Sequence, residues 1–501
     1  PTFTLIIPTR NRQRTAVFAI ESAINCRDSD LQIIVCDNSD NDLLKSEISR
    51  RGWLQKLLYL KTESVLSMRD NWEFALDHSE GDFVTVIGDD DAVMPDCFAW
   101  AKNTFSRVDV EVLQPKHAIY KWDDYPFHGR RQYLACSFGE RIFKNSKPRD
   151  FLRKGIEYKV TLGTGPGIYY GFVRRDFLIS LKNRRGRWLC DPVPDLDSGY
   201  ATLMYSDAYA TAERNVFVSG HSGPSNSGAI RSYNKLRENL KTFSEEAEMN
   251  ADNVLLSDFP KLQANEAVIV SGQMRLLPEI RNVLNDQQLE VNLIGAWQFI
   301  SDSLAQSYET LSWSESKSAL KALSEKWGIS DKVALPERRS LCAGVMREQR
   351  PRSLSNDTRS ATVSAKFDRI VVNGNRLNFK SIIDAVNFIQ SVLPPLIRVD
   401  GSNQRILSSQ DEDERIKEIM SLAAFRVSRD ELTEALEEIL PVLIDHPHNV
   451  GLLCRSIDIY VKQNRMQLAR ELTEQLLSIT KNEKVVERYS QILVNYGQSF
   501  T

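Results

Sequence analysis

Three adjacent aspartates, Asp89, Asp90 and Asp91, are the residues of this chain best suited to carry out chemistry. They directly follow a short apolar run at 83–87, which is typical of a buried strand. Neighbouring carboxylates repel one another, so the ionised cluster is costly unless a positive charge neutralises it. Mg²⁺ and Mn²⁺ prefer oxygen ligands, and Mg²⁺ commonly binds through one or two carboxylates and the phosphates of a substrate. The triplet therefore predicts a divalent-cation site. The alternative is a solvated acidic turn that caps a helix near Pro95.

The elements that must position these carboxylates alternate along the start of the chain. The sequence predicts strands at 3–7, 31–36, 57–60 and 83–87, and helices at 15–26, 41–50 and 68–78. Continuous apolar strands that alternate with helices indicate a mostly parallel sheet with helices on both faces. Ligands of such sheets bind beyond the carboxyl ends of the strands. Thr9, Asp37 and the aspartate triplet lie at such ends, so we expect them to converge on one crevice.

Four segments in this order resemble a family 2 glycosyltransferase with the GT-A fold. They are TLIIPTRNR at the start, IIVCDNSD at the second strand, MRDNWEFAL before the acidic strand and VIGDDDAVMP around the triplet. The resemblance covers roughly residues 1–230, under half of the chain. It implies a Rossmann-like GT-A domain, a nucleotide-sugar donor and a Mn²⁺ or Mg²⁺ cofactor.

The resemblance also implies roles for residues that bind the nucleotide-sugar. Pro8, Thr9 and Arg10 match the first-strand loop, which lies against the nucleotide. Asp37 matches an acidic residue that hydrogen-bonds uracil or a similar base, and a carboxylate can accept from an imide N–H. A helix N-cap is the alternative role for Asp37. Asn71 matches an asparagine near the nucleotide.

For the metal, the resemblance favours Asp90, with Asp89 facing the ribose or supporting the site and Asp91 holding a metal-bound water. Which of the three binds directly stays open. Some relatives place a histidine after the base as a third ligand, which makes His221 a candidate; a surface-loop histidine without a ligand is the alternative. The Gly- and Ser-rich segment around it can offer N–H groups to a diphosphate, with three candidate residues: Ser222, Ser225 and Asn226.

An inverting transfer also needs a base that takes the proton of the acceptor hydroxyl. The family commonly keeps this base in a Glu-Asp pair, which is absent at the expected place here. The segment CDPVPDLDSGYATL at 190–203 instead resembles a proline-Asp-x-x-Ser-Gly variant. This match makes Asp195 the base, with Asp197 as second choice and Asp191 as a further candidate. The alternative is an acidic loop before a helix capped by Asp197 or Ser198.

A basic segment precedes these acidic residues. Arg184, Arg187 and Trp188 spell R-x-x-R-W, a signature of processive polysaccharide synthases, but there it follows the acidic motif. We interpret 182–187 as a solvated basic loop that can contact an anionic acceptor.

Composition limits the class of protein. At 501 residues we expect two or three domains, and a net charge of −3 gives no indication of a nucleic-acid surface. No apolar run approaches the roughly 18–20 residues that span a bilayer, and no signal peptide is visible. The seven cysteines form neither a metal-like spacing nor a paired framework. We expect a cytoplasmic protein with reduced thiols, and a peripheral contact with the inner face of the membrane stays open.

The remainder of the chain is helical and charge-rich. We predict four parts: a GT-A domain at 1–232, a helical extension at 233–335, a linker with a small strand and helix element at 336–410, and a C-terminal helical bundle at 411–501. In the last part, leucines recur on two helices about 36 residues apart, which resembles a tetratricopeptide repeat without its consensus. A small bundle is the preferred interpretation. A homo-oligomer stays open.

The function expected from the resemblance is an inverting, metal-dependent transfer of a sugar from a nucleotide-sugar, a UDP-sugar by preference, to a glycan acceptor. Family association suggests a lipid-linked acceptor in bacterial capsule or O-antigen synthesis. The alternatives are an enzyme that glycosylates a protein and a catalytically inactive nucleotide-binding scaffold. The missing Glu-Asp pair is the observation in favour of the scaffold.

Overall fold

The computed structural model describes most of the first 336 residues and parts of the remainder. The described ranges are 2–125 without Ser29, 131–225 without 138 and 140, 264–306, 313–336, parts of 363–392, 406–407, 439 and parts of 449–490. They divide into two compact units, one formed by 1–365 and 369–404 and the other by 366–368 and 405–501.

The first unit begins with four parallel strands in the order β3-β2-β1-β4. These strands are β1 (Phe3–Thr9), β2 (Leu31–Asp37), β3 (Leu58–Lys61) and β4 (Phe83–Val86). They are connected by α1 (Gln13–Ile24), α2 (Leu43–Arg50) and α3 (Met68–Leu76). Every strand and helix predicted over residues 3–87 is present, so the α/β fold class is confirmed.

Beyond β4 the same sheet becomes mixed, which the sequence pattern did not predict. β9 (Phe172–Arg174) is antiparallel to β4 and to β6 (Val112–Lys121), whereas β10 (Tyr209–His221) is parallel to β6. Shorter antiparallel partners are β5 (Ala92–Val93), β7 (Tyr133–Ser137), β8 (Ile142–Asn145) and β12 (Arg369–Asn373). The other described strands are β11 (Val363–Lys366) and β13 (Ile406–Leu407).

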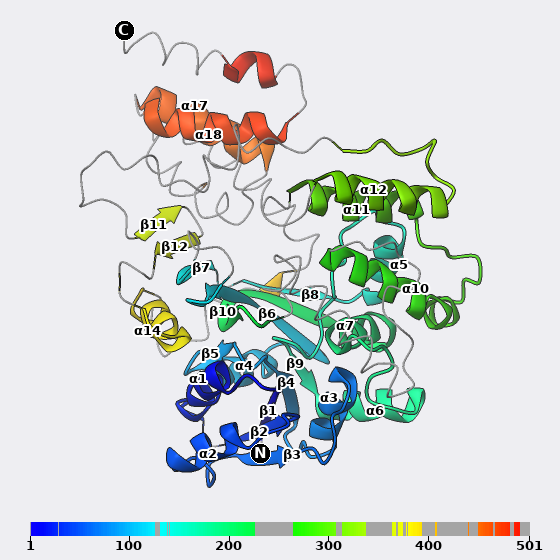
Figure 1. The fold of residues 1–501 in the computed structure, drawn as a ribbon. Coiled ribbons are helices and arrows are strands. Elements are labelled where there is room, and N and C mark those ends of the chain that lie inside the picture. The colour runs from blue at the N-terminus through cyan, green and yellow to red at the C-terminus, as the bar shows by residue number, and fades with distance from the viewer. Residues whose placement is uncertain are drawn as a thin grey trace. The chain divides into compact units, whose positions relative to one another are not determined.

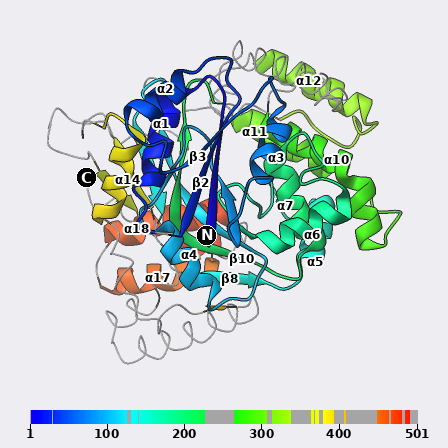
Figure 2. The same ribbon diagram turned by 90° about the horizontal axis from the view of Figure 1, so that it is seen from below.

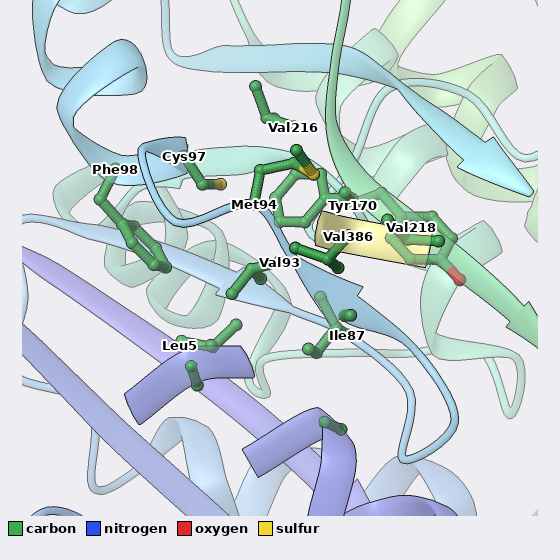
Figure 3. Packing of buried hydrophobic residues seen from close by; sticks show 14 of the residues in the cluster. Leu5, Ile87, Val93, Met94, Cys97, Phe98, Tyr170, Val216, Val218 and Val386 are labelled. Atoms are coloured by element: carbon green, nitrogen blue, oxygen red, sulfur yellow. The ribbon is translucent and has the colours of Figure 1, made fainter. Parts of the chain in front are cut away.

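Helices cover both faces of this sheet, as Figures 1 and 2 show. One face packs against α1, α2, α4 (Cys97–Phe105) and α14 (Ile382–Val392); residues of this core, among them Phe98 and Val386, are drawn in Figure 3. The opposite face carries α3, α5 (Pro148–Ile156), α6 (Arg175–Arg185), α7 (Pro194–Tyr205), α10 (Asn265–Leu284), α11 (Leu293–Gln306) and α12 (Trp313–Lys326). Because α7 and α10 share this second core, the helical extension packs directly on the domain that precedes it.

The second unit contains a helical pair, α17 (Val450–Lys462) and α18 (Met466–Ile479). Leu472 and Leu476 are buried in its core, as the leucine spacing predicts. The earlier leucines of the predicted repeat, Leu432, Leu436 and Leu440, lie outside the described residues. No described helix has the length and apolarity needed to cross a membrane.

Candidate active site

The polar ends of β1, β2 and β4 meet at one edge of the sheet. Thr9 pairs with Asp37 in the parallel register of β1 and β2, and the Thr9 hydroxyl donates to Asp89 Oδ2 at 2.7 Å. Pro8 lies beside Cys36 in the same register, and the half-buried Arg10 follows β1 directly. Residues that are 80 positions apart in sequence are thereby in direct contact. The strand-end rule accounts for this convergence, because parallel strands end at the same edge.

Asp89 is tied to the first-strand loop by an additional ion pair. Arg12 Nη1 lies 3.2 Å from Asp89 Oδ1, and Arg12 Nη2 donates to the carbonyl of Pro224 at 2.8 Å. Arg12 therefore connects the acidic triplet to the segment that follows β10. Both oxygens of Asp89 accept hydrogen bonds, from Thr9 and from Arg12, and this carboxylate is held in a fixed orientation.

Asp90 is buried but keeps one carboxylate oxygen available. Its Oδ2 accepts from the Ser222 hydroxyl at 2.6 Å and from the Ser222 N–H at 3.1 Å. Its Oδ1 has no hydrogen-bond donor among the residues that the structure describes. Burial, together with the charges of Asp91 and Asp89, raises the pKa of Asp90 to about 7. A cation that reached Oδ1 would relieve this cost.

Asp91 is fully engaged by the protein itself. Its Oδ1 accepts from the Gly220 N–H at 2.7 Å, and its Oδ2 accepts from the Gly88 N–H at 2.5 Å and from the Tyr169 hydroxyl at 2.9 Å. The side chain is completely buried, and burial raises its pKa to about 6 although these donors oppose the shift. Asp91 therefore links β10 and Tyr169 to the turn after β4, and it presents no vacant oxygen.

The aspartate triplet offers one carboxylate oxygen that suits a divalent cation. Asp90 Oδ1 is a hard oxygen ligand at the end of a strand, and Mg²⁺ needs only one or two carboxylates when substrate phosphates complete its coordination. No group of three Asp, Glu, His or Cys side chains that could hold a metal is assembled within the described residues. The ligand set of Asp90, Asp91 and His221 therefore stays a prediction.

His221 differs from the expected loop residue because it is the last residue of β10. Gly220 on one side of it hydrogen-bonds Asp91, and Ser222 on the other side hydrogen-bonds Asp90. The half-buried imidazole has its centroid 6.4 Å from that of Tyr125. Ser225 donates to the carbonyl of Ser222 at 2.9 Å, whereas Asn226 lies outside the described residues.

Asp37 is completely buried at the end of β2. Its Oδ2 accepts from the Tyr59 hydroxyl and lies 3.6 Å from Lys61 Nζ, and its Oδ1 accepts from the Ser39 N–H at 2.9 Å. The alternative role as a helix N-cap is wrong, because Asp42 holds that position in α2. A nucleobase N–H that binds Asp37 would have to displace the Tyr59 hydroxyl from Oδ2, share Oδ2 with it, or share Oδ1 with the Ser39 N–H.

Asn71 lies on α3, five per cent exposed, with its side-chain oxygen 3.1 Å from Cys36 Sγ. This contact places Asn71 against β2, one residue before Asp37. The six cysteines within the described residues, Cys36 among them, are all free thiols.

The segment with the candidate bases is not a loop before a helix. Helix α7 begins at Pro194, with Val193 as its N-cap, so the expected caps at Asp197 or Ser198 are wrong. Asp195 and Asp197 instead lie in the first turn of α7. Proline is favourable at the first helical position because its missing N–H would have no intrahelical partner there.

The three candidate bases have different partners. Asp197 is completely buried and accepts two hydrogen bonds from Arg185, at 2.7 and 2.8 Å. Asp191 is two per cent exposed and accepts from Arg275 at 2.7 and 2.9 Å. Asp195 is half-buried, and no described Lys, Arg or His forms an ion pair with it. Desolvation raises the pKa of Asp195 above its ordinary value. Of the three carboxylates, Asp195 is the one left available for a substrate proton.

Ser198 and Gly199 fix the start of α7 against a neighbouring loop. The Ser198 hydroxyl accepts from the Ile168 N–H at 3.2 Å and donates to the carbonyl of Asp195 at 3.1 Å. A Cβ at Gly199 would lie 1.9 Å from the carbonyl oxygen of Thr164. The Ser-Gly pair of the motif therefore allows the close approach that places Asp195, and Ile168 precedes the tyrosine that holds Asp91.

We expect Gly199→Ala to lower both stability and turnover. The added methyl group overlaps the backbone of Thr164, so α7 or the loop must shift, at a cost of about 1–3 kcal/mol. Urea unfolding measures the loss of stability, and turnover per bound donor molecule measures the displacement of Asp195. Normal turnover with normal stability would contradict the close approach.

The basic segment is not a solvated loop, which corrects the expectation for 182–187. It forms the end of α6, closed by Gly186 in the left-handed conformation at φ 83°. Lys182 pairs with Asp77 at 2.7 Å, and Arg187 pairs with Glu73 at 2.6 Å. Trp188 is buried. These cations are committed to α3, so the segment is not an open basic surface.

Two residues of the site, Arg12 and Tyr169, were missed from the sequence. Arg12 lies in the TRNR stretch after the first strand, so proximity to the loop was the only signal. Tyr169 packs against Tyr170, with ring centroids 4.1 Å apart, and its hydroxyl donates to Asp91. Nothing in the sequence spacing of these tyrosines indicates the contact with the triplet. Both contacts join residues more than 70 positions apart.

Comparison with known proteins gives one family match, over the first part of the chain. Residues 4–172 match the family model described as glycosyl transferase family 2. No curated protein matches the chain. Among solved structures, one match is TarS from S. aureus, residues 1–349, with 13% sequence identity and a TM-score of 0.34. The match covers 66% of this chain and 91% of that chain.

A second solved structure is the mannosyltransferase PcManGT from Pyrobaculum calidifontis in complex with GDP-Man and Mn²⁺. It is 15% identical, covers 66% of this chain and 88% of that chain, and gives a TM-score of 0.33. These TM-scores are too low to transfer detail from either structure.

Proposed function

We propose that this chain, whose residues 4–172 form a family 2 glycosyltransferase domain, is an inverting, metal-dependent enzyme that moves a sugar from a UDP-sugar to a glycan acceptor. The observation that carries the proposal is the convergence of Thr9, Asp37 and Asp89 at one edge of the sheet, beside the buried Asp90. A polar strand-end crevice is the place where such a sheet binds a nucleotide.

The positions of these groups support a binding mode for the donor. Asp37 would offer a carboxylate to the imide N–H of uracil. Pro8 and Thr9 at the end of β1, and Arg10 directly after it, lie at the same edge of the sheet. Asn71 of α3 contacts Cys36, the residue before Asp37, and would support the nucleotide site from that side. Asp89, oriented by Thr9 and Arg12, would accept from a ribose hydroxyl.

Departure of the diphosphate needs compensation for negative charge. Asp90 would hold Mn²⁺ or Mg²⁺ through its available Oδ1. Asp91 would fix the turn that carries Asp90, and His221 at the end of β10 is a further candidate ligand. When bound, the cation supplies Lewis-acid stabilisation of the leaving diphosphate. Ser222 and Ser225 lie in the same segment, where their hydroxyls donate to Asp90 and to the Ser222 carbonyl. Each hydroxyl would have to turn away from that acceptor to donate to a phosphate oxygen.

The acceptor hydroxyl loses its proton to Asp195. Attack by this oxygen on the anomeric carbon from the face opposite the diphosphate inverts the configuration, and the transition state resembles an oxocarbenium ion. Arg185 and Arg275 neutralise Asp197 and Asp191, so Asp195 is the base that the contacts favour. An available carboxylate also weighs against an inactive scaffold.

We further propose that the acceptor is a growing glycan, with a lipid-linked chain in surface-polysaccharide assembly as the first candidate. This choice rests on family association. A protein acceptor is the second candidate, because the chain has an additional unit at 405–501 with a helical pair of its own.

Donor hydrolysis in the absence of acceptor tests the enzyme assignment. The full chain is incubated with UDP-sugars and GDP-mannose, with Mn²⁺ or with EDTA, and release of nucleoside diphosphate is followed. We expect slow, metal-dependent release from one UDP-sugar. Binding of UDP without any release, across all donors and glycan acceptors, would favour the scaffold instead.

We expect Asp37→Ala to weaken UDP binding by about 1.5–3 kcal/mol, the contribution of one charged hydrogen bond. Isothermal titration calorimetry measures the change. Asp42→Ala is the matched control, because Asp42 is an exposed carboxylate five residues further along, at the N-cap of α2. Equal affinities for both variants would remove Asp37 from the binding site.

A further inference from the structure

Helix α10 lies outside the residues that match the family model, yet it packs on the helix that carries the proposed base. Leu196, next to Asp195, is completely buried, and its Cδ2 lies 2.6 Å from the position of a Cβ on Gly272. Gln273 Nε2 donates to the Tyr200 hydroxyl at 2.7 Å. The extension therefore meets α7 along the turn that contains Asp195.

Arg275 of α10 contacts the segment that leads to the base. Its Nε and Nη2 donate to the two oxygens of Asp191 at 2.7 and 2.9 Å, and its Nη1 donates to Ser271 Oγ at 2.5 Å. The Asp191 side chain is one per cent exposed. Two parallel N–H···O bonds fix the orientation of the carboxylate as well as its charge.

Asp191 in turn shapes the backbone that leads into α7. Its Oδ1 accepts from the Val193 N–H at 3.0 Å, and its own N–H donates to Asp197 Oδ1 at 3.1 Å. Val193 is the N-cap of α7. The position of the first helical turn, and with it Asp195, is thereby connected to Arg275 through one carboxylate.

A second ion pair on α10 holds the same helix further along. Arg185 Nη2 donates to Glu279 Oε2 at 3.0 Å while also binding Asp197, and the Tyr205 hydroxyl donates to Glu279 Oε1 at 2.8 Å. The charged group that acts on Asp195 is Asp191, which pairs with Arg275 of α10. Asp197, in the same helical turn as Asp195, pairs with Arg185 of α6, which also binds Glu279 of α10. All of these charges are paired.

We propose that α10 is a positioning element of the transferase, in which Arg275 holds Asp191 and through it orients the base Asp195. The inference rests on the proposed function of Asp195. Stability alone is a poor reason for this ion pair, because buried ion pairs can often be replaced by apolar side chains without loss of stability. A bidentate pair does provide fixed geometry, and a misplacement of about 1 Å can cost about 10²-fold in rate.

Arg275→Met in the full chain tests this inference. We expect kcat, calculated from the concentration of enzyme that binds UDP, to fall by about 10²-fold. The Kd for UDP-sugar should stay within twofold. Arg275→Lys, which keeps the charge but loses the bidentate geometry, should recover part of kcat. Arg281→Met is the matched control, because Arg281 lies on the same helix and donates to the carbonyl of Leu289. It should lower the melting temperature without changing kcat per bound UDP.

The outcomes separate the inference from the function on which it rests. A wild-type chain that turns over no donor would contradict the proposed function. An active wild type together with Arg275→Met at full kcat would overturn the positioning role. If Arg275→Met fails to bind UDP, a double variant that combines Arg275→Met with Asp191→Asn is measured. The asparagine removes the unpaired negative charge of Asp191 and keeps an acceptor for the Val193 N–H. This double variant should bind UDP with low kcat, and full kcat would again overturn the role.

Discussion

Asp90→Asn is expected to abolish sugar transfer while leaving a folded protein. The cation that Asp90 Oδ1 would hold contributes several kcal/mol to stabilising the leaving diphosphate, and each 1.36 kcal/mol is a tenfold change in rate. We therefore expect a loss of about 10³-fold or more in Mn²⁺. An asparagine oxygen can still accept from the Ser222 hydroxyl and N–H, so the local structure is retained.

The same substitution should stabilise the metal-free protein, and more so at higher pH. The pKa of Asp90 is about 7 in the folded chain against an ordinary value of 3.8, so the folded state binds more protons than the unfolded state between these values. Stability of the wild type is therefore lost as the pH rises through this window. The melting temperature of Asp90→Asn should exceed that of the wild type at pH 8, with a smaller difference at pH 5.

Asp91→Asn is the matched control within the triplet. Asp91 accepts from Gly88, Gly220 and Tyr169, and an amide cannot accept at both of its polar atoms. We expect this variant to lose about 1–3 kcal/mol of unfolding free energy, because a buried donor is left unsatisfied. Near-normal turnover of Asp90→Asn in Mn²⁺ would show that the metal is held elsewhere.

The sequence was sufficient for the parallel half of the sheet and for the convergence at its edge. The apolar runs that become β1, β2 and β4 are continuous because both sheet faces are covered, which makes them visible without a structure. Thr9 and Asp89 could be placed together because the ends of parallel strands share an edge. Local pattern and a general rule of topology were enough for these residues.

The partners of the triplet could not be predicted in the same way. Ser222 contacts Asp90 from 132 positions away, and Tyr169 contacts Asp91 from 78 positions away. These contacts depend on how β10 and the loop before β9 cross the sheet, and the sequence pattern did not predict the mixed half. The role of Arg275 is hidden for the same reason, since it lies 84 positions from Asp191.

The alternative interpretation placed the start of α7 too late in the sequence, at a cap on Asp197 or Ser198, although the signal for the true start was present. Pro192 and Pro194 suggest a broken loop, but proline at the first position of a helix is favourable and marks a start. Moving the start of the helix to Pro194 places Asp195 in the first turn, where helix N–H groups and a buried environment surround its carboxylate.

Asp195→Asn is expected to lower kcat by about 10²–10⁴-fold, the usual contribution of a general base, with little change in the Kd for UDP-sugar. The amide keeps the shape of the carboxylate but cannot take up the acceptor proton. The loss should appear in turnover because Asp195 lies at the start of α7 and the donor groups lie at the ends of β1, β2 and β4. Stopped-flow or steady-state transfer assays with calorimetric UDP binding separate the two quantities.

The pH dependence gives a second, independent signature of Asp195. A base acts only when ionised, and desolvation raises the pKa of Asp195 above its ordinary value of 3.8. Activity of the wild type should therefore fall as the pH drops through a midpoint above 3.8, and this acid limb should be absent from the residual activity of Asp195→Asn. Asp197→Asn is the matched comparison, since it disrupts the buried pair with Arg185 and should reduce stability and donor binding together. If Asp195→Asn is nearly as active as the wild type while Asp197→Asn or Asp191→Asn folds and is inactive, the base lies in this segment at another residue. Full activity in all three variants would show that the base lies outside residues 191–197.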